Sequence, residues 1–442
     1  MLVVKPLSNG RESIINGGEI MENNSRQSSG GTDRLISRRK LLATMGGAGA
    51  LLAAEGLFSG GLVAHAMGKR NGEDKGKGNQ KPTTANVGLC EYNVADYGAA
   101  GDGTTDDTVA IAAAIAACAA GGGGIICFPA GTYLTGTVQV GGNMELKGVG
   151  QDVTVLKLKS GVNDALVLGT LTENITVSNM TLDGNAPQQT TGSTVIFWKC
   201  KRIRIEKVKV VRSHVIALNM SNVMESTITQ CHLKGTIGNT VVSFSNDDAA
   251  YADGNNWVVD NLIEDGYLDG IIYNTNRGLI ANNIIRNNGL VPGNTAGGIY
   301  VNGKFGIVIS NNLIEGNDGN GIDIINATEI ISDGNWCSDN NSAGIMYASV
   351  THSQIVGNVC KNNGKAPATG QDDGISILGS SSLITITGNR CFDNQSVKTQ
   401  RYGIHSIDSS NELLITSNIL KGNLNGGLST VGTANVTANN LV

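Results

Sequence analysis

The sequence predicts an all-β solenoid, a single-stranded parallel β-helix, and three observations predict it. Glycine is abundant, at 61 of 442 residues, whereas charged residues make up 16% and aromatic residues 4% of the chain; average domains carry about 25% charge. Short segments with alternating apolar residues repeat at intervals of about 22 residues, a spacing typical of coils of short strands. Each unit holds three such segments, joined by turns rich in Asn and Gly, which accept tight or left-handed backbone geometry.

The N-terminal segment, residues 1–66, is predicted to be an export signal that carries an extra N-terminal tail. Adjacent Arg38 and Arg39 precede an apolar stretch and a small-x-small site at residues 64–66, a pattern that resembles a bacterial twin-arginine signal. A membrane anchor is the alternative, but several glycines and Glu55 within the stretch argue against a spanning helix. We therefore expect a secreted protein without membrane contact after export, with a polar linker over residues 67–88.

The remaining domain, residues 89–442, is acidic. It holds 20 Lys and Arg against 30 Asp and Glu, a net charge of 20 − 30 = −10. This balance argues against nucleic acid as a partner. A polyanionic substrate would need a local basic patch or a divalent cation, whereas a neutral glycan would not. Seven of the 20 cations lie in a run that alternates with apolar residues, typical of strands with a charged outer face in solvent or at a subunit contact: Lys199, Lys201, Arg202, Arg204, Lys207, Lys209 and Arg212.

Two rows of asparagine mark the repeat. The first row is Asn261, Asn283, Asn312, Asn335, Asn358, Asn389, Asn418 and Asn440. Five residues after most of these comes a second row, Asn288, Asn317, Asn340, Asn363, Asn394 and Asn423. We expect equivalent Asn side chains to stack one rung apart and to hydrogen-bond along the coil. About eleven rungs at ~4.8 Å each predict a coil of ~50 Å.

Cysteines follow the same repeat. Cys337, Cys360 and Cys391 each fall two residues after an Asn of the first row, at a position that points inward. An exported protein invites a disulfide interpretation, but three equivalent inward positions favour a stack of buried thiols. The other cysteines show no metal-ligand spacing.

The segment over residues 92–136 reads YNVADYGAAGDGTTDDTVAIAAAIAACAAGGGGIICFPAGTYLTG. In the order and spacing of DYGA, GDG, DDT, the alanine helix and FPAGTY, it resembles the opening of the pectate lyase superfamily, which includes polygalacturonase-like proteins and alginate epimerases. The resemblance implies a right-handed coil that acts on polysaccharide. It also implies that this segment is an N-terminal cap and that the chemistry lies farther along the chain.

The predicted cap is an α-helix over residues 109–120. Asp106 and Asp107 precede it and are expected to cap its N-terminus and to favour its dipole. Val109, Ile111, Ile115 and Cys118 offer apolar contacts with which the helix would close the end of the coil and shield an open strand edge.

In that superfamily the outer face of the first strand of each unit forms the substrate groove. Carried over to this chain, the resemblance assigns the Gly-Ile segments, such as residues 321–322, to that strand. Four expanded turns are expected to overhang the same face, because loops on a rigid coil commonly carry function. Three lengthen one turn, at residues 289–297, 364–373 and 394–402, and one lengthens the other turn, at residues 246–256.

Candidate site residues follow from this placement. Alternation puts Tyr300, Asp323, Met346, Ser376 and His405 on the outer face of the first strands. The single opposing loop carries Asp247, Asp248, Tyr251 and Asp253, with Asp269 one rung later. The Asp247-Asp248 pair corresponds to the Asp-Asp of the polygalacturonase pattern, whereas neither Gly-His-Gly nor the Asp-Pro-His of alginate epimerases occurs. Asp and Asn in such turns also cap backbone groups without any catalytic role.

Two chemistries fit these residue types. A glycoside hydrolase needs two carboxylates that flank the glycosidic oxygen, and the candidates are Asp247, Asp248, Asp269 and Asp323. A lyase needs a base for the proton α to a uronate carboxylate and a group that neutralises that carboxylate, and the candidates are Tyr300, Lys304, Arg401 and His405. Tyr251, Arg401 and Tyr402 are expected to bind substrate. Asp247, Asp248 and Asp253 are expected to hold a Ca²⁺ that bridges to it, and no organic cofactor is expected.

The sequence thus favours a secreted polysaccharide lyase with a long open groove, which cleaves a uronic-acid polymer of the alginate or pectate type by β-elimination. A glycoside hydrolase or fructan-type transferase that uses paired Asp residues is the second hypothesis, and a non-catalytic glycan-binding solenoid is the third. The substrate partner is a polysaccharide in each case. Monomer and homotrimer are both compatible with the pattern.

Overall fold

The computed structural model describes residues 91–442 apart from 292–295, 366–371, 408–409 and 433. The predicted export signal and linker lie outside the described residues. Within the described part, every helix is too short or too polar to span a bilayer.

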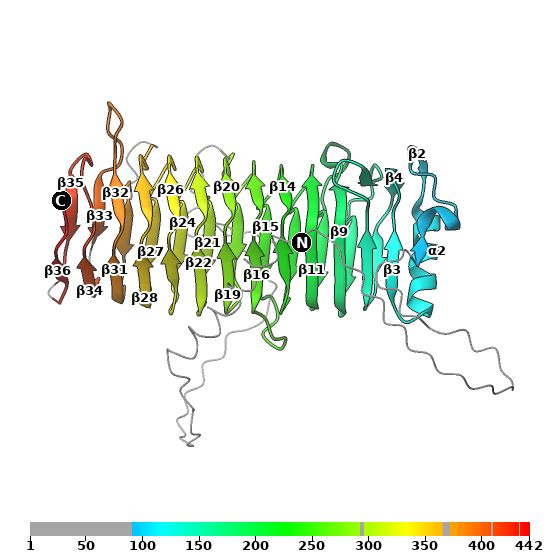
Figure 1. The fold of residues 1–442 in the computed structure, drawn as a ribbon, viewed down its shortest axis with the longest axis horizontal. Coiled ribbons are helices and arrows are strands. Elements are labelled where there is room, and N and C mark those ends of the chain that lie inside the picture. Colours follow the sequence, from blue (N-terminus) through cyan, green and yellow to red (C-terminus); the bar gives the residue numbers. More distant parts are fainter. Residues whose placement is uncertain (1–90, 292–295, 366–371, 408–409, 433) are drawn as a thin grey trace, which may run out of the picture. The chain divides into compact units, whose positions relative to one another are not determined.

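Two parallel sheets make up the coil, and Figure 1 shows their strands stacked rung upon rung. Sheet B has twelve strands among the described residues: β5 (Val138–Val140), β8 (Val167–Thr170), β10 (Val195–Trp198), β12 (Leu218–Ser221), β15 (Val242–Ser245), β18 (Ile271–Tyr273), β21 (Ile299–Asn302), β24 (Ile322–Ile325), β27 (Ile345–Ala348), β30 (Ile375–Leu378), β33 (Tyr402–Ser406) and β35 (Gly426–Thr430).

Sheet A joins the second and third strands of each unit, together with the strands of the N-terminal segment. Its strands are β1 (Tyr92–Asn93), β2 (Asp102–Asp106), β3 (Gly124–Cys127), β4 (Gly131–Thr135), β6 (Met144–Lys147), β7 (Thr154–Leu158), β9 (Glu173–Asp183), β11 (Lys201–Val211), β13 (Thr227–Thr229), β14 (His232–Lys234), β16 (Asn256–Val259), β17 (Leu262–Glu264), β19 (Gly278–Ala281), β20 (Ile284–Arg286), β22 (Ile307–Ser310), β23 (Leu313–Glu315), β25 (Ile331–Asp333), β26 (Trp336–Ser338), β28 (Thr351–Val356), β29 (Val359–Lys361), β31 (Ser382–Thr387), β32 (Arg390–Phe392), β34 (Asn411–Thr416) and β36 (Val436–Ala438).

One unit shows how the sequence builds a rung. β21, β22 and β23 follow one another, and the chain then returns to β24, which pairs with β21 in parallel register, Ile299 with Ile322 and Tyr300 with Asp323. Ile299 and Ile322 are fully buried, as are the equivalent apolar residues of other rungs. The period-2 alternation therefore separates an aliphatic core from the outer face, as predicted.

The α-helix α2 (Thr108–Ala120) lies at the N-terminal end of the coil (Figure 1). Ile111 and Cys118 are buried in the main core, but Val109 is 82% exposed and makes no core contact. Asp107 occupies the N-cap position without a side-chain bond to the helix, because its carboxylate accepts the N–H groups of residues 100 and 101 instead. Asp106 accepts the Thr108 N–H at 3.1 Å. Whether the helix protects the coil end stays a prediction.

The first Asn row forms the predicted ladder. The Asn312 side-chain amide donates to Oδ1 of Asn335 at 2.9 Å, and Asn335 donates to Asn358 at 3.0 Å. The residue before each ladder Asn adopts a left-handed conformation, as in Asn311 (φ 56°), and glycine takes this position in other rungs, as in Gly334 (φ 65°). The ladder and this φ requirement together explain the excess of Asn and Gly in the composition.

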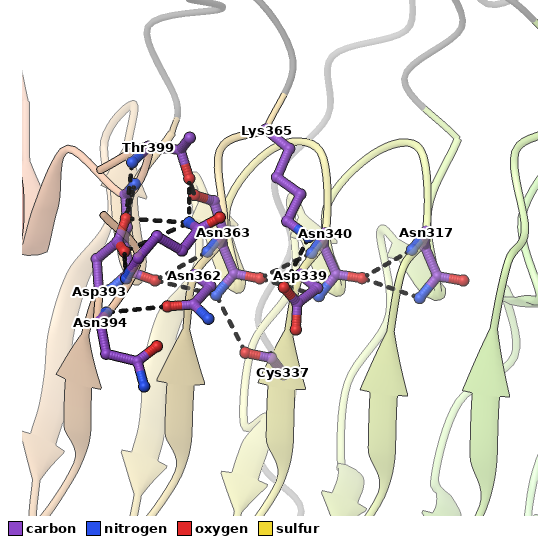
Figure 2. Close-up of polar contacts among 12 residues, drawn as sticks. Asn317, Cys337, Asp339, Asn340, Asn362, Asn363, Lys365, Asp393, Asn394 and Thr399 are labelled. Carbon is purple, nitrogen blue, oxygen red and sulfur yellow. Dashed lines mark hydrogen bonds and ion pairs between the residues drawn. The ribbon is translucent and has the colours of Figure 1, made fainter. Parts of the chain in front are cut away.

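The second row contains one substitution that the spacing did not predict. Figure 2 shows Asn317, Asn340 and Asn363 in one line. At the next rung the ladder continues through Gln400, whose Oε1 accepts from Asn363 Nδ2 at 3.1 Å and whose Nε2 donates to Asn423 at 2.7 Å. The prediction of Asn394 at this place was wrong. Asn394 bonds instead through its backbone N–H to Asn362.

The predicted thiol stack is confirmed. Cys337, Cys360 and Cys391 are register partners on β26, β29 and β32, and all three are free and fully buried. Burial raises the pKa of the Cys337 and Cys391 thiols well above their ordinary value. Cys127 in β3 is disulfide-bonded, which the spacing analysis did not predict.

The basic run lies beside carboxylates, most of them on other rungs and one, Glu206, on the same strand as its partner Arg204. Its ion pairs are Lys199–Asp248, Lys201–Glu225, Arg202–Glu173, Arg204–Glu206, Lys209–Asp152 and Arg212–Asp183. Beyond Lys199, this local neutralisation supports the interpretation of the run as a charged outer face.

A buried carboxylate on the outside of sheet A makes stability depend on pH. Glu264 has a side chain that is 7% exposed and accepts bonds from His232, Lys234 and Arg286. Burial acts to raise its pKa, but these hydrogen bonds outweigh burial and hold the pKa at about 2, against an ordinary value of 4.5. The folded-state pKa is lowered, so the stabilisation is present above about pH 4.5 and is lost as the pH falls toward about 2.

We predict that Glu264→Gln lowers the free energy of unfolding by about 2–3 kcal/mol at neutral pH. Thermal or urea unfolding of both proteins between neutral pH and acid measures this difference. The gap between wild type and variant is expected to close as the pH falls below about 4.5. A gap that does not depend on pH would show that packing, and not the charge, is responsible.

Candidate functional site on the outer face of sheet B

Expanded turns border sheet B along both edges, as predicted. The loop over residues 246–255 connects β15 to β16 at one edge. At the opposite edge, the described residues 287–291 and 296–298 precede β21, residues 362–365 and 372–374 precede β30, and residues 393–401 precede β33. A rigid coil thus holds long loops on both sides of one face, the arrangement in which solenoids commonly place binding residues.

Lys199 is the centre of a cluster at the edge of β10. Its ammonium lies 4.0 Å from the centroid of the Trp198 ring and 3.9 Å from that of Tyr251, and 2.8 Å from Asp248 Oδ2. The Lys199 side chain is only 10% exposed, whereas Trp198 and Tyr251 are 37% and 40% exposed. The cation is therefore fixed between two rings whose other surfaces remain accessible. Such cation–π contacts strengthen when the cation is desolvated.

The two aspartates of this loop have different surroundings. Asp247 is exposed, and its Oδ2 accepts the hydroxyl groups of Ser221 at 2.5 Å and Ser245 at 3.0 Å, on two adjacent strands of sheet B. The hydrogen bond from Lys199 holds the pKa of Asp248 below its ordinary value. We call Trp198, Lys199, Asp247, Asp248 and Tyr251 the Lys199 cluster.

The far end of the same loop contacts later rungs. Asp253 Oδ2 lies 4.0 Å from the ammonium of Lys304, which follows β21, and Asn276 donates to Asp253 at 3.5 Å. Asp247, Asp248 and Asp253 thus face three different partners. The described residues hold no group of three His, Cys, Asp or Glu side chains that could bind a metal ion. The predicted calcium ligands do not fit a shared cation, and we derive no step through Ca²⁺.

Three predicted residues lie elsewhere on the coil. Tyr300 and Asp323 are register partners on β21 and β24, with Asp323 4% exposed. Asp269, at the opposite edge, accepts the Gly297 N–H at 2.8 Å and so ties one turn to the next. This bond gives Asp269 a structural role.

The outer face of sheet B is not equally exposed along its length, and the predicted long open groove stays a prediction. Asp323, Met346 and Ser376 are 4%, 5% and 0% exposed, although they alternate outward from the core. Met346 and Leu378 pack with Ala343 in an apolar cluster separate from the main core. The outer face between β24 and β30 is thus largely withdrawn from solvent: Met346 and Leu378 pack in the apolar cluster, and Ser376 donates to buried Asp373.

Beyond this covered stretch, Arg401, Tyr402 and His405 converge on Asp373. Arg401 donates to the Asp373 carboxylate through Nε at 3.0 Å and Nη2 at 2.8 Å, and Ser376 donates at 2.8 Å. His405 Nδ1 lies 3.2 Å from the same carboxylate, and its ring stacks on Tyr402 at a centroid distance of 5.0 Å. Burial opposes ionisation, but the bonds from His405, Arg401 and Ser376 hold the pKa of Asp373 below its ordinary value.

The structure therefore divides the predicted residues among separate places. We call Asp373, Arg401, Tyr402 and His405 the Asp373 cluster. Eight strand spacings separate β10, at whose edge Lys199 lies, from β33, which carries His405, about 38 Å, so the Lys199 cluster and the Asp373 cluster cannot act on the same bond. Sequence reasoning missed Trp198, Lys199 and Asp373. The aromatic residue beside Lys199 within the basic run was the available signal for the first pair, whereas Asp373 carried no signal beyond its place at the end of an expanded turn.

Comparisons with known proteins agree with this architecture. The family model described as rhamnogalacturonase A/epimerase, pectate lyase-like, matches residues 92–323, and that of the right-handed β-helix region matches residues 269–442. Mannuronan C5-epimerase AlgE2 of Azotobacter vinelandii is 33% identical over 109 residues, 22% of this chain and 11% of its own length. Alginate lyase 7 of the same organism is also 33% identical over 109 residues, 22% of this chain and 13% of its own length.

A solved structure extends the likeness along the coil. The A-module of Azotobacter vinelandii mannuronan C5-epimerase AlgE6 superimposes with a TM-score of 0.66 at 19% identity, over 79% of this chain and 99% of that module. By contrast, the chain matches only about a tenth of the length of the curated relatives named above. The family model spans more than half of the chain. This protein is a right-handed parallel β-helix that belongs to the rhamnogalacturonase A/epimerase, pectate lyase-like family.

Proposed function

We propose that the protein is an enzyme that acts on a uronic-acid polymer of the alginate or pectate type and cleaves it by β-elimination at the Lys199 cluster. The observation that carries the proposal is the ammonium of Lys199, fixed between two half-exposed aromatic rings beside exposed hydroxyl and carboxylate groups. The relatives named above, mannuronan C5-epimerases and an alginate lyase, support a uronate polymer as the substrate class.

The cluster offers the groups that this chemistry needs. Removal of the proton α to a uronate carboxylate builds negative charge on that carboxylate, which a fixed cation stabilises. In the proposal, Lys199 binds the carboxylate and the Trp198 and Tyr251 rings pack against the sugar. The phenolate form of Tyr251 takes the proton α to the carboxylate, the bond to the 4-linked oxygen breaks as the double bond forms, and the Tyr251 hydroxyl returns the proton to that leaving oxygen. Asp248 forms an ion pair with the Lys199 ammonium at 2.8 Å. Asp247, together with Ser221 and Ser245, binds hydroxyl groups of the sugar.

Epimerisation at the same carbon would begin with the same proton removal, and it differs only in the step that follows. Elimination expels the 4-linked sugar and leaves a double bond, whereas epimerisation returns a proton to the opposite face. The product, and not the first step, separates these two outcomes.

A hydrolase is the second candidate, and the different surroundings of Asp247 and Asp248 favour it. Glycoside hydrolysis requires two carboxyl groups in different protonation states. Lys199 favours the ionised form of Asp248, which suits a base or nucleophile, and Asp247 is the second carboxyl group of the pair.

Ultraviolet absorbance separates these chemistries. Incubation with mannuronan or polygalacturonate is expected to produce the absorbance of an unsaturated uronate, and Tyr251→Phe is expected to abolish most of it while the protein remains folded. New reducing ends without this absorbance would overturn β-elimination in favour of hydrolysis. A change in uronate stereochemistry without chain cleavage would assign the protein as an epimerase.

A further inference from the structure

The Asp373 cluster lies apart from the Lys199 cluster, where the reaction is proposed. It contains more hydrogen bonds between side chains than the fold alone requires. Asp373 is fully buried and collects donors from Arg401, Ser376 and the Tyr402 N–H, the last at 3.1 Å. These bonds, two of them from Arg401, fill the carboxylate, which offers about four acceptor positions. Asp373 therefore fixes the two side chains that flank it, Arg401 and His405.

The loop that supplies Arg401 is itself rigidly held. The carboxylate of Asp393 accepts the N–H groups of Gln395, Thr399 and Gln400, which closes the loop on itself. Gln400 is locked into the ladder of side-chain amides. The next residue is Arg401, so its guanidinium begins from a fixed backbone position at the edge of β33.

Contacts at His405 decide what this site presents to a ligand. His405 Nδ1 has two neighbours, Arg401 Nη2 at 2.7 Å, which can only donate, and the Asp373 carboxylate at 3.2 Å, which can only accept. In the tautomer that satisfies the shorter contact, Nδ1 accepts from Arg401 and the ring proton sits on Nε2. In that tautomer Nε2–H is a donor to a ligand.

Arg401 adds a second donor beside it. Its bonds to Asp373 and His405 engage Nε and Nη2, and Nη1 remains for a ligand. The Arg401 and His405 side chains are 23% and 13% exposed, and the Tyr402 ring stacked on His405 provides an apolar surface. Two fixed donors, one of them a guanidinium, beside an aromatic ring suit the carboxylate of an acidic sugar.

We propose that Arg401, Tyr402 and His405, fixed by buried Asp373, form a second uronate-binding site, separate from the Lys199 cluster. The inference rests on the proposed function only for the class of sugar. The two sites lie about 38 Å apart, with the covered stretch of sheet B between them, so short ligands occupy them independently.

Isothermal titration calorimetry with a mannuronate trisaccharide tests this proposal on the full chain. Wild type is expected to bind two trisaccharides, His405→Ala one, and Lys199→Met one. Arg401→Lys keeps the positive charge beside Asp373 but loses the forked N–H donors of the guanidinium. The affinity of this variant for the trisaccharide at the second site is expected to fall at least about tenfold. Ser429→Ala, the register partner of His405 on β35, is the matched control and is expected to bind like wild type.

The outcomes are distinguishable from those of the proposed function. If His405→Ala and Arg401→Lys both remain folded by circular dichroism and bind two trisaccharides with unchanged affinity, the second site is overturned, whether or not the enzyme turns over. If a neutral glucan trisaccharide binds the second site as tightly, the carboxylate assignment is overturned. Two trisaccharide sites without any turnover would overturn the reaction and leave the second site standing.

Discussion

Replacement of Lys199 by Met lowers kcat/KM on a uronate polymer by about 10²–10³-fold, the range expected when one fixed group that stabilises developing charge is removed. Met keeps most of the aliphatic stem between the rings of Trp198 and Tyr251, so the packing of the cluster is largely preserved while the charge is lost. The same initial rates of ultraviolet absorbance that report the reaction measure this change.

Lys201→Met is the matched control. Lys201 belongs to the same basic run and pairs with Glu225 at 3.3 Å, but it has no contact with the two rings. We expect it to keep wild-type kcat/KM to within about twofold, because exposed ion pairs contribute little. Equal losses in both variants would show that the overall charge of the run, and not the Lys199 cluster, drives activity. A folded Lys199→Met variant with full activity would remove the cluster from the mechanism.

The contrast between these two lysines also shows where sequence reasoning reached its limit. Alternation of basic and apolar residues correctly predicted strands with a charged outer face, and most of that charge is neutralised by neighbouring rungs. Lys199 differs because the loop after β15 folds back across two rungs to reach it. A contact made by a loop of irregular conformation has no period, so no repeat pattern could predict it.

The repeat itself was predictable because geometry enforces it at every rung. Each turn needs a residue that accepts a left-handed conformation and a side chain that bonds both neighbours, which leaves Asn and Gly at fixed intervals. Asn312 and Asn335 lie where the spacing places them. The exposure of the outer face of sheet B was less predictable. Alternation tells which side chains point outward, but not whether an outward side chain such as Met346 packs on its neighbours and covers that face.

Gln400 and Asn394 show the same limit of sequence reasoning in the second Asn row. Substitution of each residue tests which of them belongs to the ladder. Counting five residues from Asn389 reaches Asn394, yet the expanded turn lets the chain bring Gln400 to that place. Gln400 is fully buried, and its amide accepts from Asn363 and donates to Asn423 and to the Cys360 carbonyl at 3.3 Å. A residue one methylene longer than Asn spans the gap that the inserted turn creates.

Gln400→Ala is therefore expected to lower the free energy of unfolding by about 3 kcal/mol or more, because it leaves buried amide and carbonyl groups of two neighbouring rungs without partners. Asn394→Ala, which leaves the backbone bond to Asn362 intact, is expected to change it by less than about 0.5 kcal/mol. Urea denaturation gives both values, and hydrogen exchange over residues 389–423 reports whether the loss begins at this rung. Equal losses of unfolding free energy in the two variants would show that Asn394 belongs to the ladder after all. A Gln400→Asn variant as stable as wild type would show that the extra methylene is unnecessary, and that the loop, and not side-chain length, sets the register here.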